Sequence, residues 1–201
     1  MTARSVAQHR RSRPAASPEG NEHLTAMTGA VLLVGFAIEG LTILQLHRLL
    51  WLHFVVGFLL LGPVTLKICS TLYRFARYYT RSQPYVRRGP PAPLLRVLGP
   101  LVVLTSLAVL GTGVILAYVG PGPGNWLFLH KVSFVLWFGV MTIHVCAYAP
   151  RLPRLLRPGR RSAGPAAAPG GAARYLALAA ALAAGVLVAA VTMHLSGQWG
   201  A

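Results

Sequence analysis

Residues 126–148, WLFLHKVSFVLWFGVMTIHVCAY, form one long apolar segment. At 1.5 Å per residue it is long enough to cross a bilayer, whose hydrocarbon core is roughly 30 Å thick. Lys131, near its start, is its single formal charge with histidine taken as neutral. The stretch therefore predicts a helix that crosses a membrane.

Four further segments have the same length and character: 24–44, 50–73, 98–118 and 175–195. Only 11% of the chain is charged, whereas soluble domains carry about a quarter. We expect an all-α integral membrane protein with five transmembrane helices and the lipid bilayer as its surroundings. A net charge of +16 alone would suggest nucleic-acid binding. Because the arginines flank apolar segments, we expect no nucleic-acid partner.

The distribution of basic residues predicts an orientation. All Lys and Arg residues except Arg48, Lys67 and Lys131 lie in three places: the N-terminal tail, the segment after the second apolar stretch and the segment after the fourth. Basic loops stay on the cytoplasmic side. We therefore expect a multi-pass protein of the cytoplasmic membrane, with the N-terminus in the cytoplasm and the C-terminus outside.

An internal repeat organises the chain. A shift of 77 residues places His53 on His130, Gly62 on Gly139 and Arg74 on Arg151 in one ungapped frame. We interpret residues 24–150 as a four-helix bundle of two related hairpins, with repeats 24–74 and 101–151. Residues 1–23 are predicted to be a disordered basic tail, 151–173 a basic Pro/Gly/Ala linker, and 174–201 a fifth transmembrane helix with the external C-terminus.

Two histidines are the strongest candidates for chemistry. His53 and His130 each lie a few residues inside the outer end of a helix that runs from outside to inside. The repeat predicts that they face each other at equal depth. Polar side chains in a membrane usually face the bundle interior. Two imidazoles so placed suit the axial positions of a b-type haem iron, which needs no covalent cysteine attachment.

Helical spacing extends this site along both helices. One face of the second helix carries His53, Gly57, Leu60, Val64 and Lys67; the matching face of the fourth carries His130, Phe134, Trp137, Met141 and His144. Gly57 would let a flat macrocycle approach the backbone. His144 lies roughly 21 Å from His130, near the opposite membrane face.

With these histidines the chain resembles the four-helix membrane b-type cytochromes, over about residues 24–150. The resemblance implies haem b held by bundle histidines and electron transfer within or across the cytoplasmic membrane. It also implies a quinone or a redox partner protein, and possible service as the electron-transfer subunit of an oxidoreductase. The resemblance also makes His144 a candidate ligand of a second, inner haem, but Lys67 stands opposite it in the repeat. One haem, at His53 and His130, therefore fits better than two, and Lys67 could ligate iron or pair with a propionate.

Glu39 is the acid inside a predicted span. It could relay a proton near the outer site, or pair with Arg48 at the interface. Other functions also remain open. Glu39, Lys67 and His144 would suit a small transporter or channel. Small residues of the fifth helix, such as Gly185, would suit a non-catalytic membrane subunit or assembly protein that packs against another membrane protein.

Overall fold

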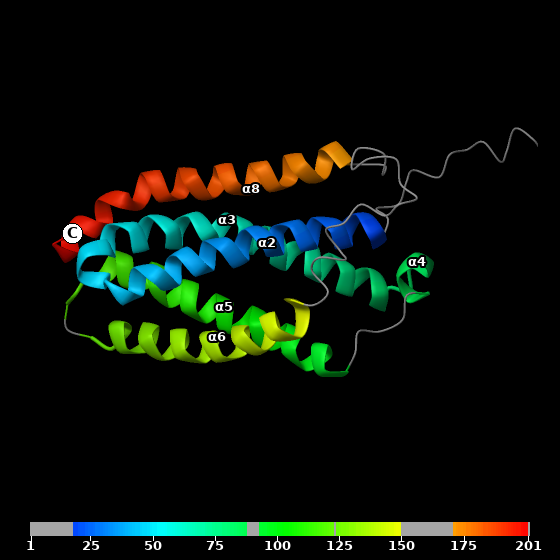
Figure 1. Cartoon of the computed structure of the whole chain (residues 1–201), viewed down its shortest axis with the longest axis horizontal. Helices are drawn as coiled ribbons and strands as arrows, with labels where there is room; N and C mark the ends of the chain where they lie inside the picture. Colours follow the sequence, from blue (N-terminus) through cyan, green and yellow to red (C-terminus); the bar gives the residue numbers. More distant parts are fainter. Residues whose placement is uncertain (1–17, 88–92, 123, 150–170, 201) are drawn as a thin grey trace, which may run out of the picture.

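The fold is an assembly of long helices. The computed structural model describes residues 18–87, 93–122, 124–149 and 171–200. Within that part, five helices are long and apolar enough to cross a membrane. They are α2 (Pro18–Leu44), α3 (Leu46–Tyr79), α5 (Pro93–Val119), α6 (Trp126–Tyr148) and α8 (Gly171–Thr192), with a short α4 (Gln83–Val86) after α3 and a 3-10 segment η2 (Met193–Trp199) after α8. Figure 1 shows the long helices running alongside one another. The predicted all-α membrane fold is confirmed.

The helices extend beyond the segments that apolarity marks. The fourth span matches α6, but α2 begins at Pro18, so residues 18–23 are helical rather than part of a tail. Likewise, α3 continues to Tyr79, and residues 171–173 open α8. Apolar composition marks only the part of a helix that lies in lipid, whereas backbone hydrogen bonds continue into the interface. The rest of the predicted tail, and the linker up to residue 170, lie outside the described residues.

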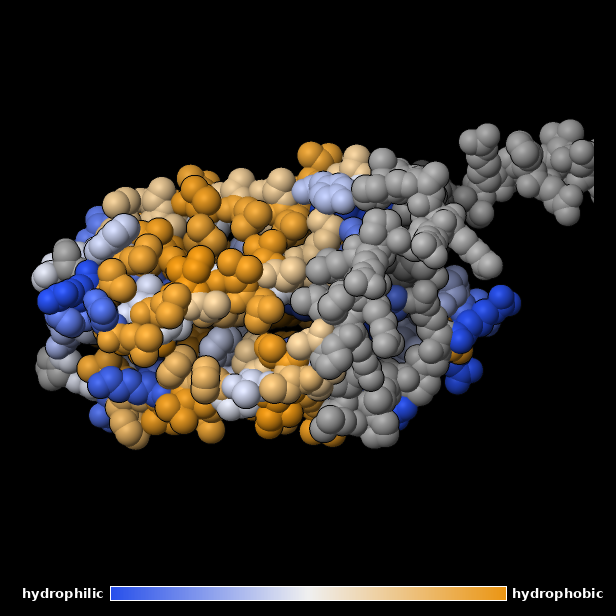
Figure 2. Space-filling view, in the orientation of Figure 1, coloured by the Kyte–Doolittle hydropathy of each residue, from blue (hydrophilic) through white to orange (hydrophobic). Residues whose placement is uncertain are grey.

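The surface is apolar around its middle. Figure 2 shows a broad band of hydrophobic residues on the visible face, with hydrophilic residues at both ends. Large apolar side chains stand out from the helices: Leu44 is 77% exposed, Leu176 68% and Val135 66%. Exposing so much apolar surface to water is unfavourable in free energy, whereas contact with lipid carries no such penalty. The band is therefore the surface that contacts the bilayer.

Helix α3 lies at the centre of the packing. It contacts α2 and α8 extensively and α5 less so, while α5 packs mainly on α6. Gln45 alone separates α2 from α3, which forces the two into an antiparallel hairpin. Between α2 and α3, Leu32, Leu60 and Val64 form a buried cluster. Leu60 and Val64 lie on the face of α3 that also carries His53 and Lys67.

Helix α8 packs on its own chain through glycine. A Cβ added at Gly62 would lie 2.0 Å from the Ala181 carbonyl oxygen, and one at Gly185 would lie 2.1 Å from the Leu59 carbonyl oxygen. Backbone contacts this close require glycine in both helices. The structure thus corrects the suggestion that Gly185 packs against another protein, because α3 already covers it.

An aromatic layer joins the two hairpins at mid-height. The rings of Phe36 in α2 and Trp137 in α6 lie 4.7 Å apart between centroids. The Trp137 indole N–H donates to the Ser106 hydroxyl of α5 at 3.1 Å, and Trp137 is only 7% exposed. This layer separates two sets of polar side chains: one toward the α2–α3 connection, the other toward α4.

Candidate functional site

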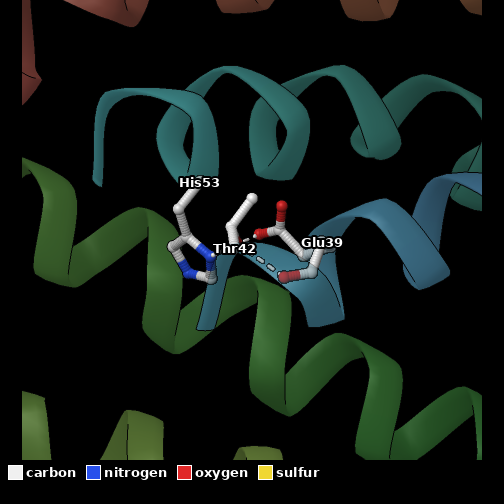
Figure 3. A network of polar contacts seen from close by, with 3 residues as sticks. All are labelled: Glu39, Thr42 and His53. Atoms are coloured by element: carbon white, nitrogen blue, oxygen red, sulfur yellow. Dashed lines mark hydrogen bonds and ion pairs between the residues drawn. The ribbon is translucent and has the colours of Figure 1, made fainter. Parts of the chain in front are cut away.

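The His53 imidazole is held by two side chains of α2. Its Nδ1 lies 2.9 Å from the Thr42 hydroxyl and 3.0 Å from Glu39 Oε1. Figure 3 shows the three residues, with Glu39 and Thr42 on α2 pointing toward the ring on α3. The tight turn at Gln45 makes this possible, because it brings the last turns of α2 beside the first turns of α3. Thr42 is almost fully buried, at 1% exposed.

These contacts determine where the His53 proton lies. The Thr42 hydroxyl donates its one hydrogen to the Glu39 carbonyl at 2.6 Å, so it accepts from His53. A carboxylate oxygen such as Glu39 Oε1 also accepts. Nδ1 therefore carries the hydrogen of the neutral ring. The lone pair of the ring is then on Nε2, the form that binds a metal through Nε2.

His130 in α6 repeats the arrangement with residues of α5. Its Nδ1 lies 3.2 Å from the Thr112 hydroxyl, and that hydroxyl donates to the Ala108 carbonyl at 2.7 Å. The Nδ1 of His130 is therefore a donor too, and its Nε2 carries the lone pair.

His53 and His130 come near each other between the two hairpins. Each belongs to a different hairpin, and each is supported by a threonine on the preceding helix of that hairpin. The arrangement therefore offers two neutral imidazoles, each with an Nε2 lone pair.

The donor set of this site fits a haem. Within the described residues, no group of three or more His, Cys, Asp and Glu side chains is placed to hold a metal ion. A haem iron needs only two axial ligands from the protein because the macrocycle supplies the others. In a metal-ligating histidine, the ring nitrogen that does not bind the metal usually donates a hydrogen bond, as Nδ1 does here. We take His53 and His130 as the pair that would hold the iron.

Two glycines lie against the side chains of the site. A Cβ at Gly113 would lie 3.0 Å from the His130 ring, and one at Gly57 would lie 3.2 Å from Glu39 Oε1. We expected Gly57 to leave room for a macrocycle, but in this structure it accommodates the Glu39 carboxylate. The glycine that admits an imidazole is Gly113.

Glu39 pairs with His53 rather than with Arg48. Arg48 is exposed on the surface, whereas the Glu39 side chain is 15% exposed. The second carboxylate oxygen, Oε2, is buried and has no hydrogen-bond partner among the described residues. The alternative that Glu39 pairs with Arg48 at the interface is therefore wrong, because Glu39 pairs with His53 inside the bundle.

Lys67 and His144 form a second polar layer. They follow His53 and His130 by fourteen residues on α3 and α6, and they also lie near each other. The repeat thus places both of its predicted pairs across the bundle from each other. His47 and His194, by contrast, are exposed.

Three residues that contact the two imidazoles were not predicted from the sequence: Thr42, Thr112 and Gly113. Threonine and glycine are common in membrane helices, so composition does not single them out. The position of Thr42 relative to His53 in the sequence could have indicated their contact. Thr42 lies eleven residues before His53 across a one-residue connection, which brings the two side chains to the same level of the hairpin.

Comparison with known proteins identifies no relative. No protein-family model, curated protein or solved structure matches the chain. The geometry of the two imidazoles is therefore the best guide to what the protein does.

Proposed function

We propose that this protein is a membrane electron-transfer protein that binds haem b between His53 and His130. The observation that carries the proposal is the hydrogen bonding of the two rings. Each Nδ1 lies within hydrogen-bond distance of a threonine hydroxyl that already donates to a carbonyl, which makes Nδ1 the donor. Each Nε2 then carries the lone pair, and among the described residues no hydrogen bond occupies it. Histidines that only stabilise a bundle would be expected to use both ring nitrogens in hydrogen bonds.

Each residue of the site has a part in this function. His53 and His130 would bind the iron, while Thr42, Glu39 and Thr112 fix the ring orientations through Nδ1. A bound haem supplies one-electron redox chemistry. The aromatic contact below the site helps to exclude water from that end of the bundle. Only a donor and an acceptor are then needed, which we take to be a membrane quinone or a redox partner protein.

We propose the cytoplasmic membrane as the location, with the His53 end facing outside. The Arg74–Arg81 region lies at the opposite end of α3, beyond Lys67, where basic residues favour the cytoplasmic side. One haem is proposed rather than two. His144 is an imidazole without a histidine opposite it, since Lys67 occupies that place.

A transporter is the second candidate, and one observation favours it. The buried, unpartnered Oε2 of Glu39 would suit a carboxylate that carries a proton or a cation. Uptake of a cation or protons by liposomes that contain the purified protein without a chromophore would favour this candidate over the cytochrome.

Replacing the two histidines tests the proposal. His53→Ala and His130→Ala should each abolish haem binding, because each removes an axial ligand. His194→Ala is the matched control, since His194 is exposed and, among the described residues, bonds to the Val191 carbonyl of its own helix end. Haem per chain would be measured after purification from cells supplied with haem. If both single variants keep the haem content of the control, the proposed ligands are wrong.

A further inference from the structure

Lys67 is a positive charge built into the membrane-crossing part of α3. Its Nζ donates to the Thr25 carbonyl of α2 at 2.5 Å. Gly29, one turn further along α2, leaves space for it, because a Cβ there would lie 3.0 Å from Nζ. An ammonium group has three donors, and this bond uses one of them.

The surroundings of Lys67 are fixed by a polar network between α2 and α3. The Thr25 hydroxyl donates to the Ser70 hydroxyl at 3.1 Å, and Asn21 donates to the Ser70 carbonyl at 3.1 Å. Ser70 in turn donates to the Lys67 carbonyl at 2.9 Å and is 6% exposed. The ammonium is thus held in place by buried hydrogen bonds, unlike a side chain that reaches freely to the interface.

His144 supplies a second polar group from across the bundle. It lies near Lys67, and its Nδ1 is buried without a hydrogen-bond partner among the described residues. The Tyr148 ring contacts the imidazole at 4.7 Å between centroids, with the two planes tilted by 37°. Two nitrogen groups on opposite helices therefore have unused hydrogen-bonding capacity.

Few acidic side chains of this chain could pair with the Lys67 ammonium. It has three acidic residues, and Glu39 pairs with His53 at the other end of the bundle. Glu22 lies 4.0 Å from Arg74. Among the described side chains, no carboxylate pairs with Lys67. A charge without a counter-charge is unfavourable within a bilayer, so a bound anion would stabilise Lys67.

We propose that Lys67 and His144 bind a carboxylate. One ammonium matches a monovalent anion, and two oxygens in one plane can accept from two nitrogen donors. Lys67 lies seven residues before Arg74 along α3. It is therefore about 10 Å deeper in the membrane than Arg74, where the basic region Arg74–Arg81 begins. A carboxylate at this depth comes from a fatty acid whose tail lies in lipid, or from a small carboxylate that enters from the polar end. The site is separate from His53 and His130 and needs no haem.

Binding of laurate to the purified full-length chain in lipid nanodiscs tests this proposal. Radiolabelled laurate should bind saturably to the wild type, and dodecanol, which has the same tail without the charge, should not compete. Lys67→Met keeps the chain length without the charge and should weaken binding about tenfold or more. His144→Ala should weaken it less. Lys131→Met is the matched control, because Lys131 is exposed and lies at the other end of the bundle.

The outcomes separate the possible ligands. Competition by acetate that depends on Lys67 would identify a small soluble carboxylate, while competition by fatty acids alone would identify the lipid source; both support the site. Equal binding by Lys67→Met and the wild type, or equal competition by dodecanol and laurate, would overturn it. A second iron per chain that is lost in His144→Ala would also overturn it. His53→Ala should still bind laurate, so failure of the haem proposal would not affect this result.

Discussion

The close contact between α3 and α8 predicts that Gly62→Ala destabilises the protein. Gly62→Ala would place a methyl group 2.0 Å from the Ala181 carbonyl oxygen and 3.0 Å from the Gly185 nitrogen. Ordinary contact begins at 3.4 Å, so the two backbones must separate by 1.4 Å at this point. Gly139 is the repeat counterpart of Gly62, and a Cβ there meets nothing within 4 Å. Gly139→Ala is therefore a matched control in an equivalent helix.

The magnitude follows from the difference between the two variants. Alanine gains about 1 kcal/mol over glycine within a helix, and this gain is shared by both. Only Gly62→Ala also suffers overpacking, which costs about 1–3 kcal/mol. The free energy of unfolding of Gly62→Ala should therefore be lower than that of Gly139→Ala by about 1–3 kcal/mol. The same displacement should loosen α8, because Gly185 faces Leu59 at the same contact.

Thermal unfolding in detergent, followed by circular dichroism, measures this difference. The midpoint should fall by about 2–4 °C for each kcal/mol in a chain of this size. The Gly139→Ala midpoint should equal or exceed that of the wild type. Equal midpoints for the two alanine variants would refute the close packing of α8 on α3.

Two further substitutions test individual hydrogen bonds. Thr112→Val removes the hydroxyl that accepts from His130 and should weaken haem affinity by about 10–100-fold. Haem titration would show this against Thr105→Val, whose hydroxyl bonds only within its own helix, and equal affinities would refute the role of Thr112. Trp137→Phe removes the bond to Ser106 and should lower the free energy of unfolding by about 1 kcal/mol. Trp51→Phe, at an exposed position, is the control in the same thermal assay, and equal midpoints would contradict the prediction.

Much of the fold could be predicted from the sequence because the bilayer restricts the possibilities. A long apolar segment must be helical in lipid, so the five spans were predictable. The extra turns at Pro18 and Tyr79 were not, because the interface permits polar residues in a helix. The position of α8 was also unpredictable, since it depends on close backbone contact at Gly62 and Gly185 rather than on hydrophobicity.

The site was predictable only in its main residues. Equal spacing in the repeat identified His53 and His130, because pseudo-symmetry brings equivalent positions across the bundle. The partners of these histidines depend on how each helix is rotated, which periodicity does not determine. Glu39 illustrates this, since Arg48 and His53 were both within reach along the chain, and only the packed hairpin selects His53.

A visible spectrum of the purified protein would show whether it binds haem. The full-length protein would be purified in detergent after expression with ample haem, and iron would be measured per chain. The proposal predicts sharp α and Soret bands in the dithionite-reduced minus air-oxidised spectrum, with about one iron per chain. About two irons per chain would require a second ligand set that includes His144. Absence of haem bands would contradict the proposed cytochrome and favour the transporter.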